Sequence, residues 1–69
     1  MTNLQDRLLD AHARDARMEL VGLYTEAADA TDDIEAACFY LTHAYVFGLE
    51  MNHPDVTALY DRLKAHERV

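Results

Sequence analysis

Residues 36–49 read Ala-Ala-Cys-Phe-Tyr-Leu-Thr-His-Ala-Tyr-Val-Phe-Gly-Leu and form the most apolar stretch of the chain. Only Thr42 and His43 interrupt it. A helix needs about 20 apolar residues to cross a membrane, and this run is shorter than that. The stretch therefore predicts a helix at the centre of the core, and we expect the other segments to pack around it.

A helical wheel divides this central helix into two apolar faces. The first, which we expect to form the core, consists of Ile34, Ala37, Cys38, Leu41, Tyr45 and Gly48, with Ala44 and Leu49 at its edges. The second consists of Ala36, Phe39, Tyr40, His43, Val46 and Phe47. A small bundle does not need this second face for its own core, so we expect it to contact another subunit.

Helical patterns also precede and follow this stretch. Residues 3–29 contain no proline and one glycine, and they carry an apolar stripe of Leu9, Ala13, Ala16, Leu20, Leu23 and Ala27. The spacing predicts one long helix over residues 3–29. Asp32 and Glu35 have the spacing of a capping box, with Thr31 as the alternative N-cap, and predict a helix over 33–51. Pro54 suits the first position of a helix over 54–67.

These elements predict an all-α fold, a three-helix antiparallel bundle with a long first helix, as a single domain over residues 1–69. At about 1.5 Å per residue the first helix would be roughly 40 Å long, against roughly 28 and 20 Å for the others. It would overhang the bundle and leave Leu4 and Leu8 without a partner in the monomer. A second copy is the simplest partner, so we expect a homodimer.

Charge and composition narrow the possible partners. Thirteen acidic and six basic residues give a net charge of −7, which argues against nucleic acid and anionic membranes as partners. The first residues lack the basic and apolar regions of a signal peptide, and we expect a cytoplasmic protein. The single cysteine, Cys38, cannot form an intrachain disulfide.

The sequence also argues against catalytic and metal chemistry. The chain has four histidines, His12, His43, His53 and His66. No two of them have the i,i+3 or i,i+4 spacing of a helical metal site, and His43 lies too far around the helix from Cys38 to activate its thiol. The chain contains no serine and a single lysine. We expect no enzyme activity, no metal and no cofactor.

Residues 20–60 carry a recognisable arrangement of small and large residues: Gly22, Tyr24, Ala37, Leu41, Ala44 and Pro54. It resembles a single tetratricopeptide-like α/α hairpin, although Gly22 and Tyr24 are one residue too close and Pro54 comes five residues late. The resemblance implies a protein-binding hairpin rather than an enzyme. It does not imply a superhelical groove, because such arrays need about three repeats.

We therefore expect a small non-catalytic protein–protein interaction module that self-associates. The expected interaction residues are Phe39, Tyr40, His43, Val46, Phe47, Leu4 and Leu8. Two alternatives stay open. One is a ligand-sensing or pH-sensing bundle that uses the Phe39/His43/Phe47 face, and the other is an acidic adaptor or inhibitor of a basic protein.

Overall fold

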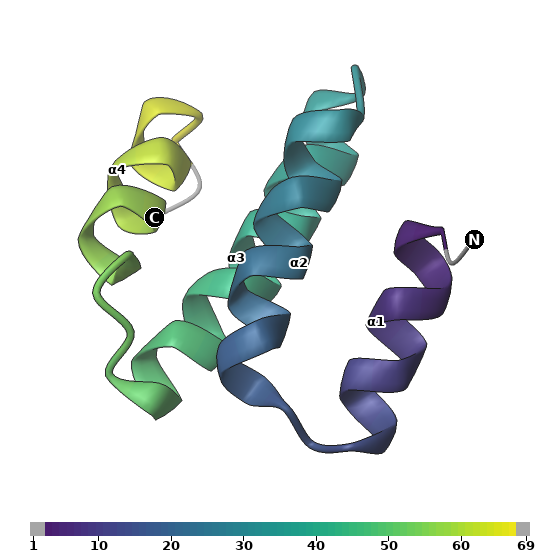
Figure 1. Ribbon diagram of the computed structural model, residues 1–69. Helices are drawn as coiled ribbons and strands as arrows, with labels where there is room; N and C mark the ends of the chain where they lie inside the picture. Colours follow the sequence, from purple (N-terminus) through teal and green to yellow (C-terminus); the bar gives the residue numbers. More distant parts are fainter. Residues whose placement is uncertain (1–2, 68–69) are drawn as a thin grey trace.

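A computed structural model describes residues 3–67, which form four α-helices: α1 (Leu4–Ala13), α2 (Arg17–Ala30), α3 (Ile34–Met51) and α4 (Val56–Ala65) (Figure 1). The described residues contain no strand. The all-α class is therefore confirmed, whereas the prediction of three helices is wrong. The helix expected over 33–51 is present as α3, and α4 begins two residues after Pro54 rather than at it.

The helix expected over residues 3–29 is broken in two by a tight reversal after Arg14. Asp15 adopts a left-handed conformation with φ of 53°. The Asp15 N–H donates to the His12 carbonyl at 3.1 Å, and the Ala16 N–H donates to the Ala11 carbonyl at 2.8 Å. This pair of hydrogen bonds is a Schellman motif, which ends a helix by satisfying its last carbonyls. It ends α1 without the glycine or proline that usually marks such a break.

The helices pack in chain order, with α1 on α2, α2 on α3 and α3 on α4, and the contact between α2 and α3 is the most extensive. In Figure 1, α2 lies in front of α3, while α1 and α4 stand on opposite sides of this pair. The Cα atoms span 34 × 28 × 13 Å. Since packed helices lie about 8–10 Å apart, this flat shape is no more than two helices deep.

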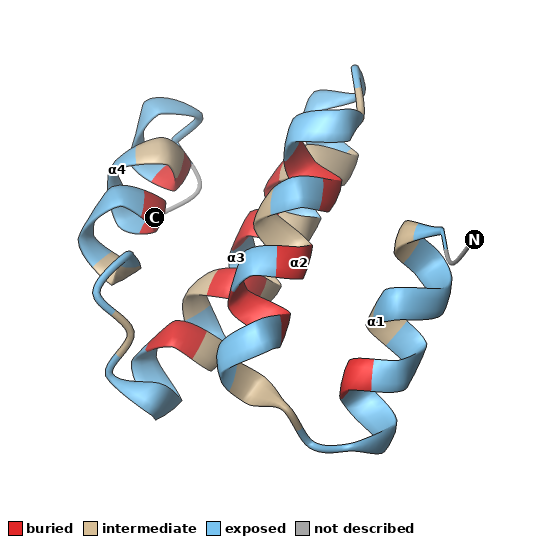
Figure 2. Cartoon of the chain, in the orientation of Figure 1, coloured by how far each residue is buried: buried red, intermediate tan, exposed pale blue. Residues whose placement is uncertain are grey.

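Two apolar clusters hold the helices together. The larger one joins α2, α3 and α4 and consists of Val21, Ala28, Cys38, Leu41, Ala44, Leu59 and Leu63. The smaller one joins α1 to α2 and consists of Ala11, Leu20 and Leu23. In Figure 2 the buried residues gather where α2 and α3 meet, and α1 contributes only Ala11.

The break after Arg14 changes the packing of the first residues. Leu4 and Leu8 are half-buried and pack against the smaller cluster, so α1 has no overhang and these two leucines do have a place in the monomer. Leu9 belongs to the apolar stripe of the helix predicted over residues 3–29, which we expected to face the core, but it is 61% exposed. On the ten-residue α1, the stripe that faces α2 runs through Leu4, Leu8 and Ala11.

The N-terminus of α3 is capped one residue later than predicted. The Asp33 carboxylate accepts hydrogen bonds from the N–H groups of Glu35 at 2.9 Å and Ala36 at 3.4 Å. Asp33 is therefore the N-cap, in place of Asp32. At the other end, Asn52 takes the left-handed conformation that ends α3.

Gly22→Ala is expected to raise the free energy of unfolding by about 1 kcal/mol, the preference of a helix interior for alanine over glycine. Gly22 is exposed within α2, and a Cβ placed there would meet nothing within 4 Å. Gly48→Ala is the matched comparison, because its Cβ would lie 2.9 Å from Val56 Cγ2. At Gly48, strain between α3 and α4 should cancel or reverse the gain in the free energy of unfolding. Urea denaturation measures both, and equal stabilisation by the two changes would contradict the close approach of α3 and α4.

Candidate interaction surface

The sequence-predicted interaction residues of α3 divide into an exposed group and a half-buried group. Phe39 is 58% exposed and Val46 is 49% exposed, whereas Tyr40, His43 and Phe47 are half-buried. The structure therefore brings together only part of the predicted face at the surface. The other part packs within the chain.

The neighbours of α3 explain this division. Tyr24 of α2 lies against Tyr40, His43 and Phe47, with ring centroids 6.2, 5.0 and 6.1 Å away. On the α4 side, the ring of Tyr45 lies 6.0 Å from that of Tyr60. The remaining side of α3 has no helix packed on it among the described residues.

We call this uncovered side the α3 ridge, and its exposed residues are Glu35, Phe39, Thr42, Val46, Leu49 and Glu50. Sequence reasoning missed Leu49, which was placed at the edge of the core but is 55% exposed. Three large apolar side chains thus lie on one side of a regular helix. An acidic residue stands at each end of the ridge.

His43 lies at the border between the ridge and the aromatic contacts with α2. Its Nδ1–H donates to the Phe39 carbonyl one turn earlier, at 2.9 Å. The carbonyl can only accept, so this bond places a proton on Nδ1. The imidazole also packs 4.4 Å from the Phe39 ring and 5.0 Å from the Tyr24 ring. These contacts hold the Phe39 ring in place on the ridge.

A shallow depression beside the ridge is lined by Thr42, His43, Val46 and Phe47 and has a volume of about 190 Å³. Small-molecule sites usually have volumes of about 300–1,000 Å³. The depression is therefore too small for a typical enclosed ligand. It can accept a side chain that projects from a partner surface.

The structure also shows an aromatic contact that sequence reasoning missed. His12 of α1 lies with Nε2 2.8 Å from the hydroxyl oxygen of Tyr24, and its ring lies 5.9 Å from the Phe47 ring. This set of rings connects α1, α2 and α3. No sequence signal predicts it, because His12 and Tyr24 meet only after the chain reverses at Asp15.

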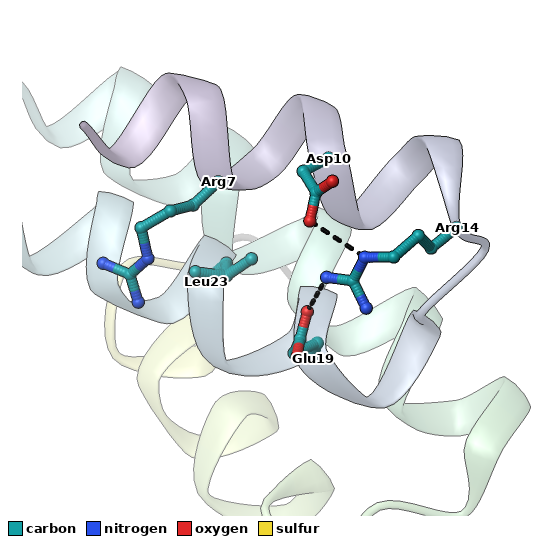
Figure 3. Close-up of a pocket in the computed structure, with 5 residues that line it drawn as sticks. All are labelled: Arg7, Asp10, Arg14, Glu19 and Leu23. Atoms are coloured by element: carbon teal, nitrogen blue, oxygen red, sulfur yellow. Dashed lines mark hydrogen bonds and ion pairs between the residues drawn. The ribbon is translucent and has the colours of Figure 1, made fainter. Parts of the chain in front are cut away.

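A second depression lies between α1 and α2 and has a volume of about 270 Å³. Figure 3 shows Arg14 between Asp10 and Glu19, with nitrogen–oxygen distances of 2.8 and 2.5 Å. Arg7, on the same wall, pairs with Glu26 at 3.2 Å. Every charged group that lines this depression therefore has an ion-pair partner within the chain, and we assign it a role in holding α1 on α2.

Three further features of residues 3–67 concern metal ligands, the thiol and membrane-spanning helices. No three histidine, cysteine, aspartate or glutamate side chains in this range are grouped as a metal site would require. Cys38 is a buried free thiol. None of the helices in this range combines the length and the apolar character that crossing a membrane would need.

Comparison of this chain with models of protein families, with curated proteins and with solved structures gives no match. The function of the chain is therefore inferred from the geometry of its surface.

Tyr24→Phe is expected to lower the free energy of unfolding by about 0.5–1 kcal/mol, because it removes the hydrogen bond to His12 near the surface. Tyr60→Phe is the matched control, since Tyr60 is 39% exposed and its hydroxyl makes no hydrogen bond within residues 3–67. Chemical denaturation near neutral pH measures both variants. Equal effects of the two changes would contradict a structural role for the His12–Tyr24 contact.

Tyr24 should also make the stability of the fold sensitive to alkaline pH. Burial, with a smaller contribution from Tyr40, raises the pKa of Tyr24 above its ordinary value. The folded state therefore favours the neutral phenol. This stabilisation is fully present below the unfolded-state pKa of about 10 and is lost as the pH rises through the folded-state pKa. The stability of the wild type should fall more steeply than that of Tyr24→Phe above about pH 10, and parallel pH profiles would contradict this.

Proposed function

We propose that this protein is a small non-catalytic interaction module that self-associates through the α3 ridge. The observation that carries the proposal is the exposure of Phe39, Val46 and Leu49 on one side of a helix that is otherwise packed. Single exposed apolar residues are common, but a continuous row of them is typical of interaction sites. Leu4 and Leu8, which pack against the smaller cluster within the chain, are no longer part of the proposed surface.

The size of the ridge indicates a weak association. Burying a Phe, Val or Leu side chain completely is worth about 1.5–3 kcal/mol. The three side chains are already about half-buried, so docking would add roughly 1 kcal/mol from each. A symmetric pair would bury six of them against an association cost of at least about 4 kcal/mol. The difference of at most about 2 kcal/mol corresponds to a dissociation constant of about 30 mM, so we expect a weak dimer that is populated only at millimolar concentrations.

The binding of a basic protein is the second candidate function, and the distribution of ion pairs supports it. Arg7, Arg14, Arg17 and Arg62 each pair with an acidic side chain of the same chain. Asp32 and Glu35, at the turn into α3, make no ion pair among the described residues. They lie beside Ile34, which is 57% exposed. A basic partner surface with an apolar residue among its positive charges would complement Asp32, Ile34 and Glu35. Its binding would weaken as the salt concentration rises.

The ligand-sensing alternative depends on the depression beside His43. Its small volume argues against an enclosed ligand. The hydrogen bond of His43 to the Phe39 carbonyl gives that ring a role within the helix. Self-association therefore remains the function that the surface supports best.

Phe39→Glu is expected to abolish self-association while the fold is retained, because it places a charge on the ridge and removes its largest exposed ring. Leu9→Glu is the matched control: it adds the same charge at a side chain that is 61% exposed, on α1 and away from the ridge. Small-angle X-ray scattering over about 0.5–10 mM measures the mass of each variant, with circular dichroism as the test of folding. A wild type that stays monomeric over the whole range would contradict the proposed function.

A further inference from the structure

The two outer helices differ in how firmly they are attached, although α1 and α4 each have ten residues. α4 buries Leu59 and Leu63 in the larger cluster, where they are 2% and 1% exposed. α1 buries Ala11 alone, and its Leu4 and Leu8 are half-buried. Because the burial of apolar surface is the main contribution that holds a helix on its neighbours, α1 is the more weakly attached of the two.

The polar contacts of α1 do not compensate for this difference. Arg7 and Arg14 pair with glutamates of α2, and all four side chains are at least 45% exposed. Ion pairs between exposed side chains contribute little to stability. His12 is also exposed, so water can replace its hydrogen bond with Tyr24. An element with few buried contacts opens at a lower free energy than the core of its domain.

A helix as short as α1 does not persist when it leaves its neighbour. Isolated helices of fewer than about 12–15 residues are marginal in water, so α1 would lose its helical hydrogen bonds on detachment. The larger cluster contains no residue of α1 and joins α2, α3 and α4 without it. Detachment of α1 is therefore a local step that leaves the main core intact.

The connection between α1 and α2 favours detachment. Asp15 has a φ of 53°, and residues other than glycine adopt this left-handed conformation at a cost in free energy. The N–H groups of Asp15 and Ala16 hold this reversal by donating to carbonyls of α1. When α1 detaches, both hydrogen bonds break and Asp15 leaves the left-handed conformation.

We propose that α1 is a hinged cover, which opens as a unit about Asp15 while α2, α3 and α4 remain folded. In the closed structure Leu20 and Leu23 of α2 are 1% and 6% exposed and form the smaller cluster with Ala11. Opening removes Ala11 from this cluster and makes an apolar face of α2 accessible. This step does not involve the α3 ridge and is independent of the proposed function.

Amide hydrogen exchange, measured by NMR on the whole chain, tests the opening. The helical N–H groups of residues 8–13 should share one opening equilibrium constant, at least about tenfold larger than that of residues 60–65 in α4. Equal constants in the two helices would overturn the proposal, because α1 would then open no more readily than α4. A constant that falls steadily from residue 8 to residue 13 would also overturn it, since that gradient indicates fraying from the N-terminus.

Leu8→Ala should raise the opening constant of residues 8–13 about tenfold, because Leu8 packs against the smaller cluster. Leu9→Ala is the matched control on the same helix. Leu9 is 61% exposed, and its replacement should change the constant by about twofold or less. Equal effects of the two changes would contradict the packing of α1 on α2 as the contact that controls opening.

Asp15→Ala and Asp15→Gly test the hinge. Both changes remove the carboxylate, so the difference between them reports the cost of the left-handed conformation, which glycine adopts readily. The opening constant of residues 8–13 should be at least about fivefold larger in Asp15→Ala than in Asp15→Gly. The same constant in both variants would overturn Asp15 as the hinge.

Discussion

The packing of α2 against α3 is the contact on which the rest of the structure depends. Small side chains meet there, including Ala28 and Ala44, together with the fully buried Val21 and Leu41. Small residues let two helices approach closely, and the larger side chains fill the space around them. The outer helices depend on this pair: α1 contacts α2, and α4 contacts α3. If α2 and α3 separated, α1 would remain on α2 and α4 on α3, but the two halves of the chain would no longer share a core.

The α2–α3 pair also determines which surface is left free. Its aromatic side is covered by the contacts of Tyr24 with α3 and of His12 with Tyr24, and α4 covers another side through Leu59 and Leu63. Ion pairs such as Arg62–Asp29 add orientation more than stability, because exposed pairs contribute about 0–1 kcal/mol. Because residues 3–67 form a slab no more than two helices deep, none of their helices covers the third side of α3. A regular helix anchored on two sides presents that third side rigidly.

A feature was predicted correctly from the sequence where the residues that determine it lie close together along the chain. The helix over 33–51 was located within a residue because its apolar run is continuous and its cap residues lie nearby. The break at Asp15 was missed because aspartate in a left-handed conformation carries no mark that distinguishes it from aspartate in a helix. That error placed Leu9 in the core and Leu4 outside it, since both assignments assumed one continuous helical wheel through residue 29. Ile34 was also misplaced, because the ten-residue α4 is too short to cover the first turn of the 18-residue α3.

By itself the sequence determined the helical class, the central position of residues 36–49 and the existence of apolar surface on both sides of that helix. These depend on periodicity and composition, which are properties of each segment alone. Only the tertiary structure decided how the second face is divided: Tyr24 of α2 covers Tyr40, His43 and Phe47, and leaves Phe39 and Val46 exposed. The physical reason is that whether a side chain is buried or exposed depends on where the neighbouring helices lie. That position was set here by a reversal at Asp15 and by the close approach of α2 and α3.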